Sequence, residues 1–375
     1  MTSTQTPAAQ AIRTIAAELV PVAAAGVPGR VNRPLVRALG ERGLLGQVFP
    51  ADAPPSAATL CTLREALAYG CTEAETALAL QGLGGWPIRR HGTPDVVRRW
   101  MPAITAGDAV AAFALSEPDA GSDAAALMLR ADAAGDGWRL TGEKLWISNA
   151  PDADVYTVFA RTTANARARG VTAFVVPGDR PGLSGERLDL LAPHAIGRLT
   201  FDGVAVGSGD VLGAVDRGFA VAMQTLTMFR PSVGAFAVGM AQAALDAAVS
   251  HAARRQAFGG PLSALQAVSH RLAELATRLE AARLLVASAA TAYDEGAGDT
   301  AVRSAMAKLF ATEVAQQVID AAIQVHGAVA LQRGHLLEHL YRDVRAPRIY
   351  EGASEVQREI IARALFARTR DPGAA

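Results

Sequence analysis

Lysine is almost absent from this chain, although basic residues are common. Of 36 lysines and arginines, only Lys144 and Lys308 are lysines, which we interpret as a coding bias toward arginine. Acidic residues also number 36, so the formal net charge is zero. No basic field is present to attract nucleic acid or anionic lipid, and the composition therefore argues against a nucleic-acid-binding protein.

Cysteine and long apolar runs are also scarce. Cys61 and Cys71 are too few for a metal cluster or a disulfide framework, and we expect both to be reduced core residues of a cytosolic protein. No run of about 20 apolar residues predicts a membrane span. The N-terminus shows no positively charged region followed by an apolar core, so no signal peptide is expected and the predicted location is the cytoplasm.

Motifs for nucleotide phosphates and metals are missing or weak. No P-loop occurs, and the glycine-rich residues 82–85 follow a helical pattern and not a strand, so a dinucleotide-binding loop is not predicted there. Residues 335–339 read HLLEH, which matches the H-x-x-E-H pattern of some zinc peptidases. So short a pattern has a high false-positive risk, and we predict no metal site.

The texture of the sequence changes twice along the chain. Residues 1–110 are rich in Ala and Leu with helical periodicity, and Pro21 and the prolines of residues 50–55 are expected to divide them into short helices. Residues 111–212 contain short β-branched and aromatic runs punctuated by Asp-Gly and Pro-Gly turns, which predict an antiparallel barrel or sandwich. Residues 213–375 are helical again, with a helical hairpin that breaks at residues 296–298. The predicted class is α+β, with three consecutive domains at these boundaries.

A glutamate near the C-terminus is placed like a general base. Residues 348–350 are expected to be extended after Pro347, and the run that ends at Phe366 is expected to be helical. Glu351 lies between them, followed by Gly352, which would allow a close approach to the backbone. The alternative is a carboxylate that only complements the helix dipole.

Four segments resemble one enzyme family. Residues 114–123 read ALSEPDAGSD and resemble the (T/S)EPxAGSD signature of acyl-CoA dehydrogenases. Residues 138–149 read WRLTGEKLWISN and resemble the xLxGxKxWI(T/S)N signature of the same family. Residues 255–259 with Gln266 resemble its RxxFG…Q element, and residues 349–352 resemble its IYEG motif. The segments occur in the family's order and spacing, and the resemblance extends from about residue 58 to residue 366.

The resemblance implies a fold, a reaction and a base. The fold would have an N-terminal helical domain, a middle antiparallel β-barrel and a C-terminal helical bundle. The reaction would be FAD-dependent α,β-dehydrogenation of an acyl thioester, acyl-CoA to trans-2-enoyl-CoA, with Glu351 taking the α-proton and flavin N5 accepting the β-hydride. Some family members carry the base just before the residue that matches Arg230, but residues 227–229 contain no acid here, which strengthens Glu351.

The resemblance also assigns cofactor contacts. The middle β segment would hold the flavin, and Arg255, Phe258 and Gln266 resemble residues that bind the FAD pyrophosphate and adenosine across a subunit interface. These predicted FAD contacts are Leu115, Ser116, Ser122, Trp146, Ile147, Ser148, Arg255, Phe258, Gln266, Gln324, Gly327, Ala328, Ala353 and Glu355. The chain departs from the family pattern at both serines beside the flavin, where Thr is usual, and at Ala328, which replaces a glycine that would allow close approach. Ala353 likewise replaces a common Thr.

Substrate and partner predictions follow from the same resemblance. The predicted substrate contacts are Ser122, Arg230, Tyr350, Gly352 and Leu83. Gly82, Gly84 and Gly85 would leave room for the acyl tail, whereas Trp86 is bulky. We expect a homotetramer, an electron-transfer flavoprotein as electron acceptor, and a role in fatty acid metabolism.

Three alternatives remain at this point. The same chemistry could act on an acyl group attached to a carrier protein. A fold relative with flavin oxygen chemistry or nitroalkane oxidation would generally lack the IYEG glutamate, so Glu351 argues against it. A helical interaction protein or DNA-associated flavoprotein is disfavoured by the neutral charge and by the presence of the base.

Overall fold

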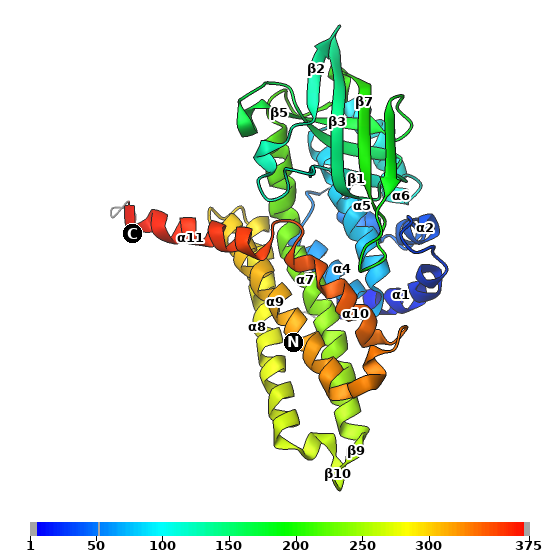
Figure 1. The fold of residues 1–375 in the computed structure, drawn as a ribbon, viewed down its shortest axis with the longest axis vertical. Coiled ribbons are helices and arrows are strands. Elements are labelled where there is room, and N and C mark those ends of the chain that lie inside the picture. Colours follow the sequence, from blue (N-terminus) through cyan, green and yellow to red (C-terminus); the bar gives the residue numbers. More distant parts are fainter. Residues whose placement is uncertain (1–5, 52, 371–375) are drawn as a thin grey trace. The chain divides into compact units, whose positions relative to one another are not determined.

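Helices precede and follow a single large sheet in the computed structural model, which describes residues 6–51 and 53–370 (Figure 1). The helices before the sheet are α1 (Pro7–Ala24), α2 (Arg33–Glu41), α3 (Leu44–Val48), α4 (Ala57–Gly70), α5 (Thr72–His91) and α6 (Pro94–Ala106). The helices after it are α7 (Gly218–Arg254), α8 (Gln266–Asp294), α9 (Thr300–His326), α10 (Leu336–Val344) and α11 (Ser354–Arg370). The predicted α+β class is confirmed.

Two compact units are formed from stretches that are not consecutive. The first contains the described residues of Met1–Glu18, Ser56–Glu75 and Thr227–Ala375, and the second contains those of Leu19–Pro55 and Thr76–Leu226. Three of the four boundaries fall inside helices α1, α5 and α7, and the fourth lies just before α4. The three consecutive domains inferred from the sequence are a description along the chain and stay a prediction.

The large sheet lies in the second unit. Its strands are β1 (Ala111–Ala114), β2 (Arg130–Ala134), β3 (Gly137–Ser148), β4 (Val155–Arg161), β5 (Val171–Pro177), β6 (Leu183–Arg187), β7 (Ile196–Gly207) and β8 (Val211–Leu212). The strand order is β6-β7-β3-β2-β4-β5-β8, and β1 also pairs with β4. Most pairs are antiparallel as predicted, but β4 pairs in parallel with both β1 and β2. The sheet is therefore mixed, which corrects the expected purely antiparallel barrel.

Burial explains the mixed pairing. Six of the seven residues of β4 and all of β5 are buried, so these strands read as continuous apolar runs and not as alternating ones. Strands buried on both faces are typical of parallel or mixed sheets. The core of the sheet includes Tyr156, Phe174 and Phe201, each at most 1% exposed.

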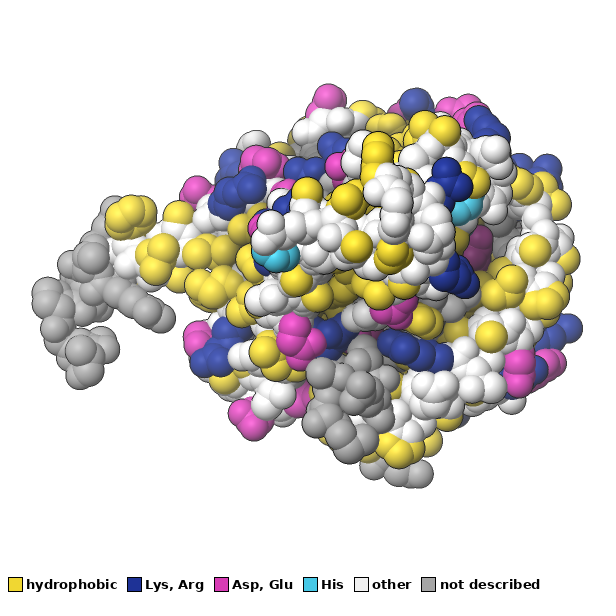
Figure 2. Space-filling view, turned by 90° about the horizontal axis from the view of Figure 1, so that it is seen from below, with side chains coloured by type: hydrophobic (Ala, Val, Ile, Leu, Met, Phe, Trp, Pro, Cys, Tyr) yellow, Lys and Arg dark blue, Asp and Glu magenta, His cyan; other side chains and the backbone are white. Residues whose placement is uncertain are grey.

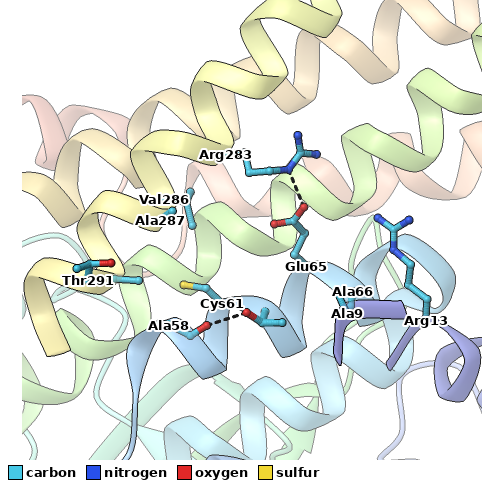
Figure 3. A pocket seen from close by; sticks show the side chains of 12 residues that line it. Ala9, Arg13, Ala58, Cys61, Glu65, Ala66, Arg283, Val286, Ala287 and Thr291 are labelled. Carbon is cyan, nitrogen blue, oxygen red and sulfur yellow. Dashed lines mark hydrogen bonds and ion pairs between the residues drawn. The ribbon is translucent and has the colours of Figure 1, made fainter. Parts of the chain in front are cut away.

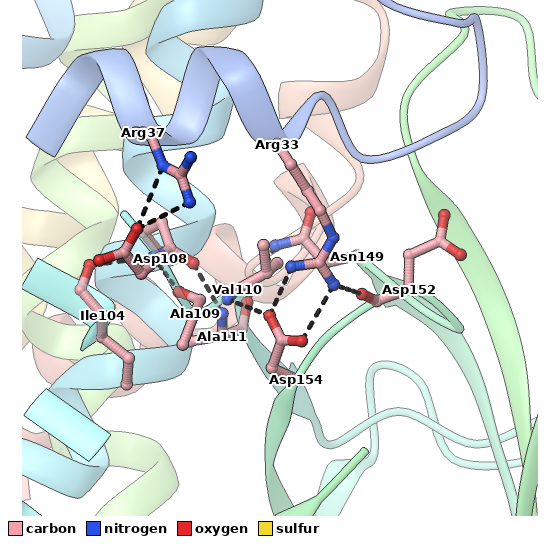
Figure 4. Close-up of polar contacts among 11 residues, drawn as sticks. Arg33, Arg37, Ile104, Asp108, Ala109, Val110, Ala111, Asn149, Asp152 and Asp154 are labelled. Atoms are coloured by element: carbon pink, nitrogen blue, oxygen red, sulfur yellow. Dashed lines mark hydrogen bonds and ion pairs between the residues drawn. The ribbon is translucent and has the colours of Figure 1, made fainter. Parts of the chain in front are cut away.

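Helix α2 is tied to the start of the sheet by two ion pairs within the second unit (Figure 4). Arg33 donates to Asp154 at 2.7 and 3.0 Å, and Asp154 also accepts the Val110 N–H at 2.7 Å. Arg37 pairs with Asp108 at 2.9 Å. These contacts fix the chain where it enters β1 and β4. The first signature segment begins at the last residue of β1, and the second lies mostly on β3.

One expected helix break is wrong. Helix α1 continues through Pro21 to Ala24, although proline lacks the N–H that a helix interior uses. The helix ends within one turn of Pro21, so little of the hydrogen-bond ladder is lost. Asn32 caps the end of α1, since its side-chain amide donates to the Val22 carbonyl at 2.9 Å.

The first unit is built on long helices. In Figure 1 the yellow α8 and the orange α9 run side by side as a hairpin, and the predicted break is confirmed by a left-handed Gly296 between them. The small strands β9 (Gln256–Ala257) and β10 (Gly260–Pro261) form a hairpin between α7 and α8. The hydrophobic core of the first unit includes Phe236, Leu275 and Val314.

Helix α7 is long and apolar enough, by length and composition alone, to cross a membrane. Of the window that passes this test, 78% is buried inside the protein. A mostly buried core helix satisfies the same test, so the indication of a membrane span is weak. On the face seen in Figure 2, basic and acidic side chains are interspersed, in keeping with the zero net charge.

Candidate active site

The turn that carries Glu351 connects a short helical turn to α11. Residues Ala346–Arg348 form a 3₁₀ turn and Ile349 has φ −108° and ψ −54°, so the extended conformation expected here is wrong. A proline at the second position of such a turn supplies the φ that the turn needs, which explains the difference. The predicted helix beyond the turn is confirmed as α11.

The backbone of this turn is strained and firmly held. Glu351 has φ +52° and Gly352 has φ +94°, and a left-handed conformation is rare for a residue other than glycine. The Glu351 carbonyl accepts from Arg230 Nε at 3.2 Å and from Gln357 Nε2 at 3.3 Å. The Gly352 carbonyl accepts from Lys308 Nζ at 2.7 Å and from Gln357 Nε2 at 2.8 Å. Four hydrogen bonds thus stabilise a conformation that would otherwise be disfavoured.

The Glu351 carboxyl group has a buried oxygen without a partner. Its Oε2 accepts no hydrogen bond from any described residue. Burial raises the pKa of Glu351, while the positive charges of Arg64, Arg230 and Lys308 act in the opposite direction. A buried carboxylate with a free oxygen and a raised pKa has the properties of a general base.

Arg64 is held in place by other partners. Its guanidinium pairs with the buried Glu75 and donates to Ser232 Oγ at 2.8 Å. Phe236 packs 5.8 Å from it. Arg64 therefore contributes positive charge near Glu351, while its Nε and Nη1 atoms donate to Glu75 and Ser232.

Sequence reasoning missed Arg64, Lys308 and Gln357 as parts of this site. Arg64 carries no signal, since it is one arginine among many. Lys308 carries a clear one: a chain that avoids lysine keeps it at only two positions. We interpreted that pattern as coding bias, whereas both lysines are fully buried.

The segments predicted to face the flavin come together in the second unit. The Ser116 carbonyl accepts the Leu145 N–H at 3.0 Å, which brings residue 116 beside Trp146. Trp146 has φ +62° and is 55% exposed, at a register shift between β3 and β7. Ser148 is half-buried nearby on β3, whereas Leu115 and Ile147 are buried. The exposed indole of Trp146 and the half-buried hydroxyl groups of Ser116 and Ser148 could contact an aromatic ring system.

A buried ion pair supports this edge. Lys144 Nζ donates to Glu117 Oε1 at 2.7 Å and to the Leu115 carbonyl at 2.9 Å. Glu117 also accepts the backbone N–H groups of Met128 and Leu129. Lys144 therefore fixes the segment that ends in Ser116.

The remaining predicted cofactor residues lie on exposed parts of the first unit. Arg255 and Gln266 flank the β9–β10 hairpin, and Phe258 at its tip is 92% exposed with φ +52°. Gln324 and Ala328 are exposed near the end of α9, and Gly327 between them has φ +68°. Ala353 is half-buried, and Glu355 is exposed and pairs with Arg358 at 3.1 Å. A nearly fully exposed aromatic ring is what a contact with another molecule requires.

The predicted substrate residues are distributed between the two units. Arg230 is buried, at 8% exposure, whereas Tyr350 is 36% exposed. In the second unit, Ser122 is exposed in a loop and Leu83 is half-buried on α5. These placements leave their contacts with substrate as predictions.

The glycines beside Leu83 serve packing and not an open space. A Cβ at Gly84 would lie 2.5 Å from the Ala112 backbone nitrogen, and one at Gly85 would lie 2.8 Å from the Phe49 ring. Helix α5 uses Gly84 to approach strand β1 closely and Gly85 to make room for the Phe49 ring. The space beside these two glycines is therefore taken up by packing.

The HLLEH segment is explained by structural contacts. The Leu337 N–H donates to His335 Nδ1 at 3.1 Å at the start of α10, and Glu338 pairs with Arg342 at 2.7 Å. His339 lies 2.6 Å from Thr72 Oγ1. No group of three potential metal ligands is found in residues 6–51 and 53–370.

A cavity of about 190 Å³ lies elsewhere in the first unit, between α1, α4 and α8 (Figure 3). It contains the Arg283–Glu65 pair, with a nitrogen–oxygen distance of 2.9 Å, and the buried Cys61, one of the two free cysteines. None of the predicted site residues lines it.

Family comparisons cover almost the whole chain. Residues 2–108, 112–204 and 216–366 match family models described as the N-terminal, middle and C-terminal domains of acyl-CoA dehydrogenase. Among curated proteins, cyclohexane-1-carbonyl-CoA dehydrogenase of Geobacter metallireducens is 36% identical over 366 residues, with 95% of this chain and 96% of that protein covered. The mitochondrial short-chain specific acyl-CoA dehydrogenase of Bos taurus is 39% identical over 357 residues, with 92% and 85% covered.

A solved structure agrees with these relatives. Butyryl-CoA dehydrogenase from Megasphaera elsdenii superposes with a TM-score of 0.88 at 31% sequence identity, with 96% of this chain and 98% of that chain covered. Both the sequence and the fold thus match along their full length. The chain belongs to the acyl-CoA dehydrogenase family, flavoprotein oxidoreductases that act on CH–CH bonds of acyl-CoA thioesters.

Proposed function

We propose that this protein dehydrogenates an acyl-CoA thioester between its α and β carbons, with Glu351 as the base. The observation that carries the proposal is the buried, unpartnered Oε2 of Glu351 on a strained turn held by four hydrogen bonds. Such a turn fixes the direction of the carboxylate before substrate binds, and preorganisation of this kind lowers the barrier to proton transfer.

The residues of the turn account for the proton. The α C–H bond breaks, the proton passes to a Glu351 carboxylate oxygen, and the electron pair forms the new double bond as a hydride leaves the β carbon. FAD, when bound, supplies the acceptor for that hydride. Burial raises the pKa of Glu351, and the positive charges of Arg64, Arg230 and Lys308 oppose that effect by favouring the ionised carboxylate, the form that acts as a base.

FAD fits the residues that would hold it. The exposed Trp146 with Ser116 and Ser148 would contact the ring system, together with Leu115, Ile147 and Ser122. Arg255, whose fork of donors suits phosphate, would bind the pyrophosphate with Phe258 and Gln266. The remaining predicted contacts are Gln324, Gly327, Ala328, Ala353 and Glu355.

Assembly, electron acceptor and location complete the proposal. The exposure of Phe258 supports a homotetramer in which the β9–β10 hairpin reaches a neighbour's cofactor. The electron acceptor would be an electron-transfer flavoprotein, and the location the cytoplasm, with a role in fatty acid metabolism. Light scattering that finds a flavin-loaded monomer at micromolar concentration would exclude the tetramer.

The test of the base is Glu351→Gln, which keeps the size of the side chain but cannot accept the proton. Anaerobic stopped-flow bleaching of the flavin by acyl-CoA should slow by about 10²–10⁴-fold, while FAD content stays at the wild-type level. Glu359→Gln is the matched control, since it removes the same charge from an exposed position on α11. Bleaching of the Glu351→Gln flavin at near wild-type rate would contradict the proposal and favour the helix-dipole alternative, which predicts only a loss of about 0.3–1 kcal/mol in stability.

A further inference from the structure

Lys308 contacts the turn that carries Glu351. It is on α9, is 0% exposed, and donates from Nζ to the Gly352 carbonyl at 2.7 Å. An ammonium group has three N–H donors, and within the described ranges this is the one hydrogen bond it donates. Burying an ammonium with a single neutral partner is unfavourable, so the position needs a physical reason.

The charged groups around Lys308 point to that reason. Four of them affect its proton affinity: Glu351, Arg230, Glu313 and Glu355. Glu313 is already bound by Arg348 at 3.0 Å and accepts from a serine hydroxyl, and Glu355 is an exposed partner of Arg358. Glu351 is the carboxylate of this group that keeps a buried oxygen without a hydrogen bond.

Lysine suits this position better than the arginine used elsewhere in the chain. Its ammonium is a compact point charge on a flexible stem, whereas a guanidinium is a planar fork that seeks two acceptors. Here the acceptor is one backbone carbonyl, Gly352 O. Lys308 can therefore hold the turn and place a charge near Glu351 without capturing its carboxylate.

The other two anchors of the turn do less. Gln357 donates to both carbonyls but is neutral. Arg230 is charged but donates to the Glu351 carbonyl at the longer distance of 3.2 Å. Lys308 combines a charge with the shortest of the four hydrogen bonds.

We propose that Lys308 is a positioning residue for the catalytic base: it fixes the Gly352 carbonyl, and so the direction of Glu351, and its charge stabilises the Glu351 carboxylate. The inference rests on the proposed role of Glu351. Burial lowers the pKa of Lys308 to about 8, while Glu351 acts to raise it, so the charge is present at neutral pH and is lost as the pH rises through that value.

Three substitutions separate the hydrogen bond from the charge. Lys308→Met removes both, Lys308→Gln keeps a donor without the charge, and Lys308→Arg keeps the charge. Arg303→Met is the matched control, because it removes a charge from an exposed position on the same helix that pairs with Asp299. The rate of anaerobic flavin bleaching by butyryl-CoA and cyclohexane-1-carbonyl-CoA is measured against pH for the flavin-loaded fraction of each variant.

Without the Lys308 charge, the Glu351 carboxyl holds its proton to higher pH. The acid limb of the Lys308→Met profile should therefore move up by about one pH unit, a rate about tenfold lower below neutrality that recovers toward alkaline pH. Lys308→Gln should show the same movement with a higher plateau. Lys308→Arg keeps the charge, so its acid limb should not move up, but its plateau should fall because the planar fork of donors can also bind the Glu351 carboxylate. Arg303→Met should match the wild type.

Backbone exchange provides a readout that does not depend on turnover. Amide hydrogen exchange of residues 350–354 should be faster in Lys308→Met than in Lys308→Gln, because only the latter can still bond to the Gly352 carbonyl. An acid limb that stays at the wild-type pH in Lys308→Met, with unchanged exchange, would overturn the inference. If Glu351→Gln also reduces its flavin normally, the base itself has been misassigned, and the two failures are thereby distinguished.

Discussion

The two lysines of the chain, one in each compact unit, are both buried but bind different kinds of acceptor. Lys144 and Lys308 are both 0% exposed, and burial lowers the pKa of each to about 8. Lys144 bonds directly to the Glu117 carboxylate, and both oxygens of Glu117 accept hydrogen bonds. Lys308 bonds to a backbone carbonyl, while the nearby Glu351 keeps one oxygen free.

The difference separates a structural pair from a reactive one. A carboxylate whose two oxygens both accept hydrogen bonds holds two segments together, and those bonds stabilise its anion and make it a weaker base. A carboxylate with a free oxygen, near positive charges that bond to other groups, can still accept a proton, although the unbonded oxygen lowers local stability. Lys144 therefore supports the shape of the flavin edge, and Lys308 supports the reactivity of Glu351.

Breaking the structural pair should have the largest effect on stability. Lys144→Met leaves the buried Glu117 charge uncompensated, and the free energy of unfolding should fall by about 3–5 kcal/mol. Denaturant titration of the holoenzyme measures this loss. The double variant Lys144→Met, Glu117→Gln should recover much of it, because Gln can still accept from the Leu129 N–H without a charge. A single variant as stable as the wild type would show that the pair is not a structural anchor.

Both lysines should make stability rise with alkaline pH. Their ordinary pKa is 10.5 and the folded value is about 8, so between pH 8 and 10.5 the unfolded chain binds more protons than the folded one. The penalty for burying the charge is present below pH 8 and is relieved across this window, by on the order of 1–3 kcal/mol per lysine. Unfolding midpoints at successive pH values should rise, and the rise should be smaller in either Lys→Met variant.

The sequence predicted the architecture well, because hydrophobic periodicity and the positions of glycines indicate where most of the helices begin and end. The periodicity of residues 266–326 and the glycines between them gave the α8–α9 hairpin, and the run after Gly352 gave α11. The parallel pairs of β4 were missed, because a fully apolar strand has no alternation to reveal its partners. The continuation of α1 through Pro21 was missed because we expected proline to end the helix. Pro21 lies in the last turn, where little of the hydrogen-bond ladder is lost.

The site was predictable only where a motif marked it. Glu351 was found from residues 349–352, but its left-handed backbone depends on Gln357 and on residues of other helices. Such long-range contacts leave no local pattern in one sequence. The glycines at 84 and 85 could not be interpreted from the sequence, because close packing and an open pocket favour the same residue.

The same substitution at Lys308 should affect stability much less than at Lys144. Lys308→Met removes one hydrogen bond, but Gln357 still donates to the Gly352 carbonyl at 2.8 Å and no carboxylate loses a direct partner. The lost hydrogen bond costs about 0.5–1.5 kcal/mol, and below pH 8 the removal of the buried charge offsets part or all of that loss. Parallel denaturant titrations of both variants test the contrast, which fails if the Lys308 variant is the less stable of the two.

The smallest effect is expected at Glu355, the acidic residue four positions beyond Glu351. Its side chain is 79% exposed and pairs only across one turn of α11, with Arg358 at 3.1 Å, among the described residues. Such a pair contributes about 0.2–0.5 kcal/mol, and the charge in the first helical turn adds about as much through the helix dipole. Glu355→Gln should therefore lower the free energy of unfolding of the apoprotein by less than about 1 kcal/mol and leave the pH profile of flavin bleaching in place. A weaker retention of FAD in this variant, with apoprotein stability unchanged, would support the predicted cofactor contact, because only the ligand-bound state would be affected. A shift of the acid limb as large as that expected for Lys308→Met would instead show that an exposed charge near the turn changes the pKa of Glu351 as much as the buried Lys308 does. The role proposed for Lys308 would then not be specific to that residue.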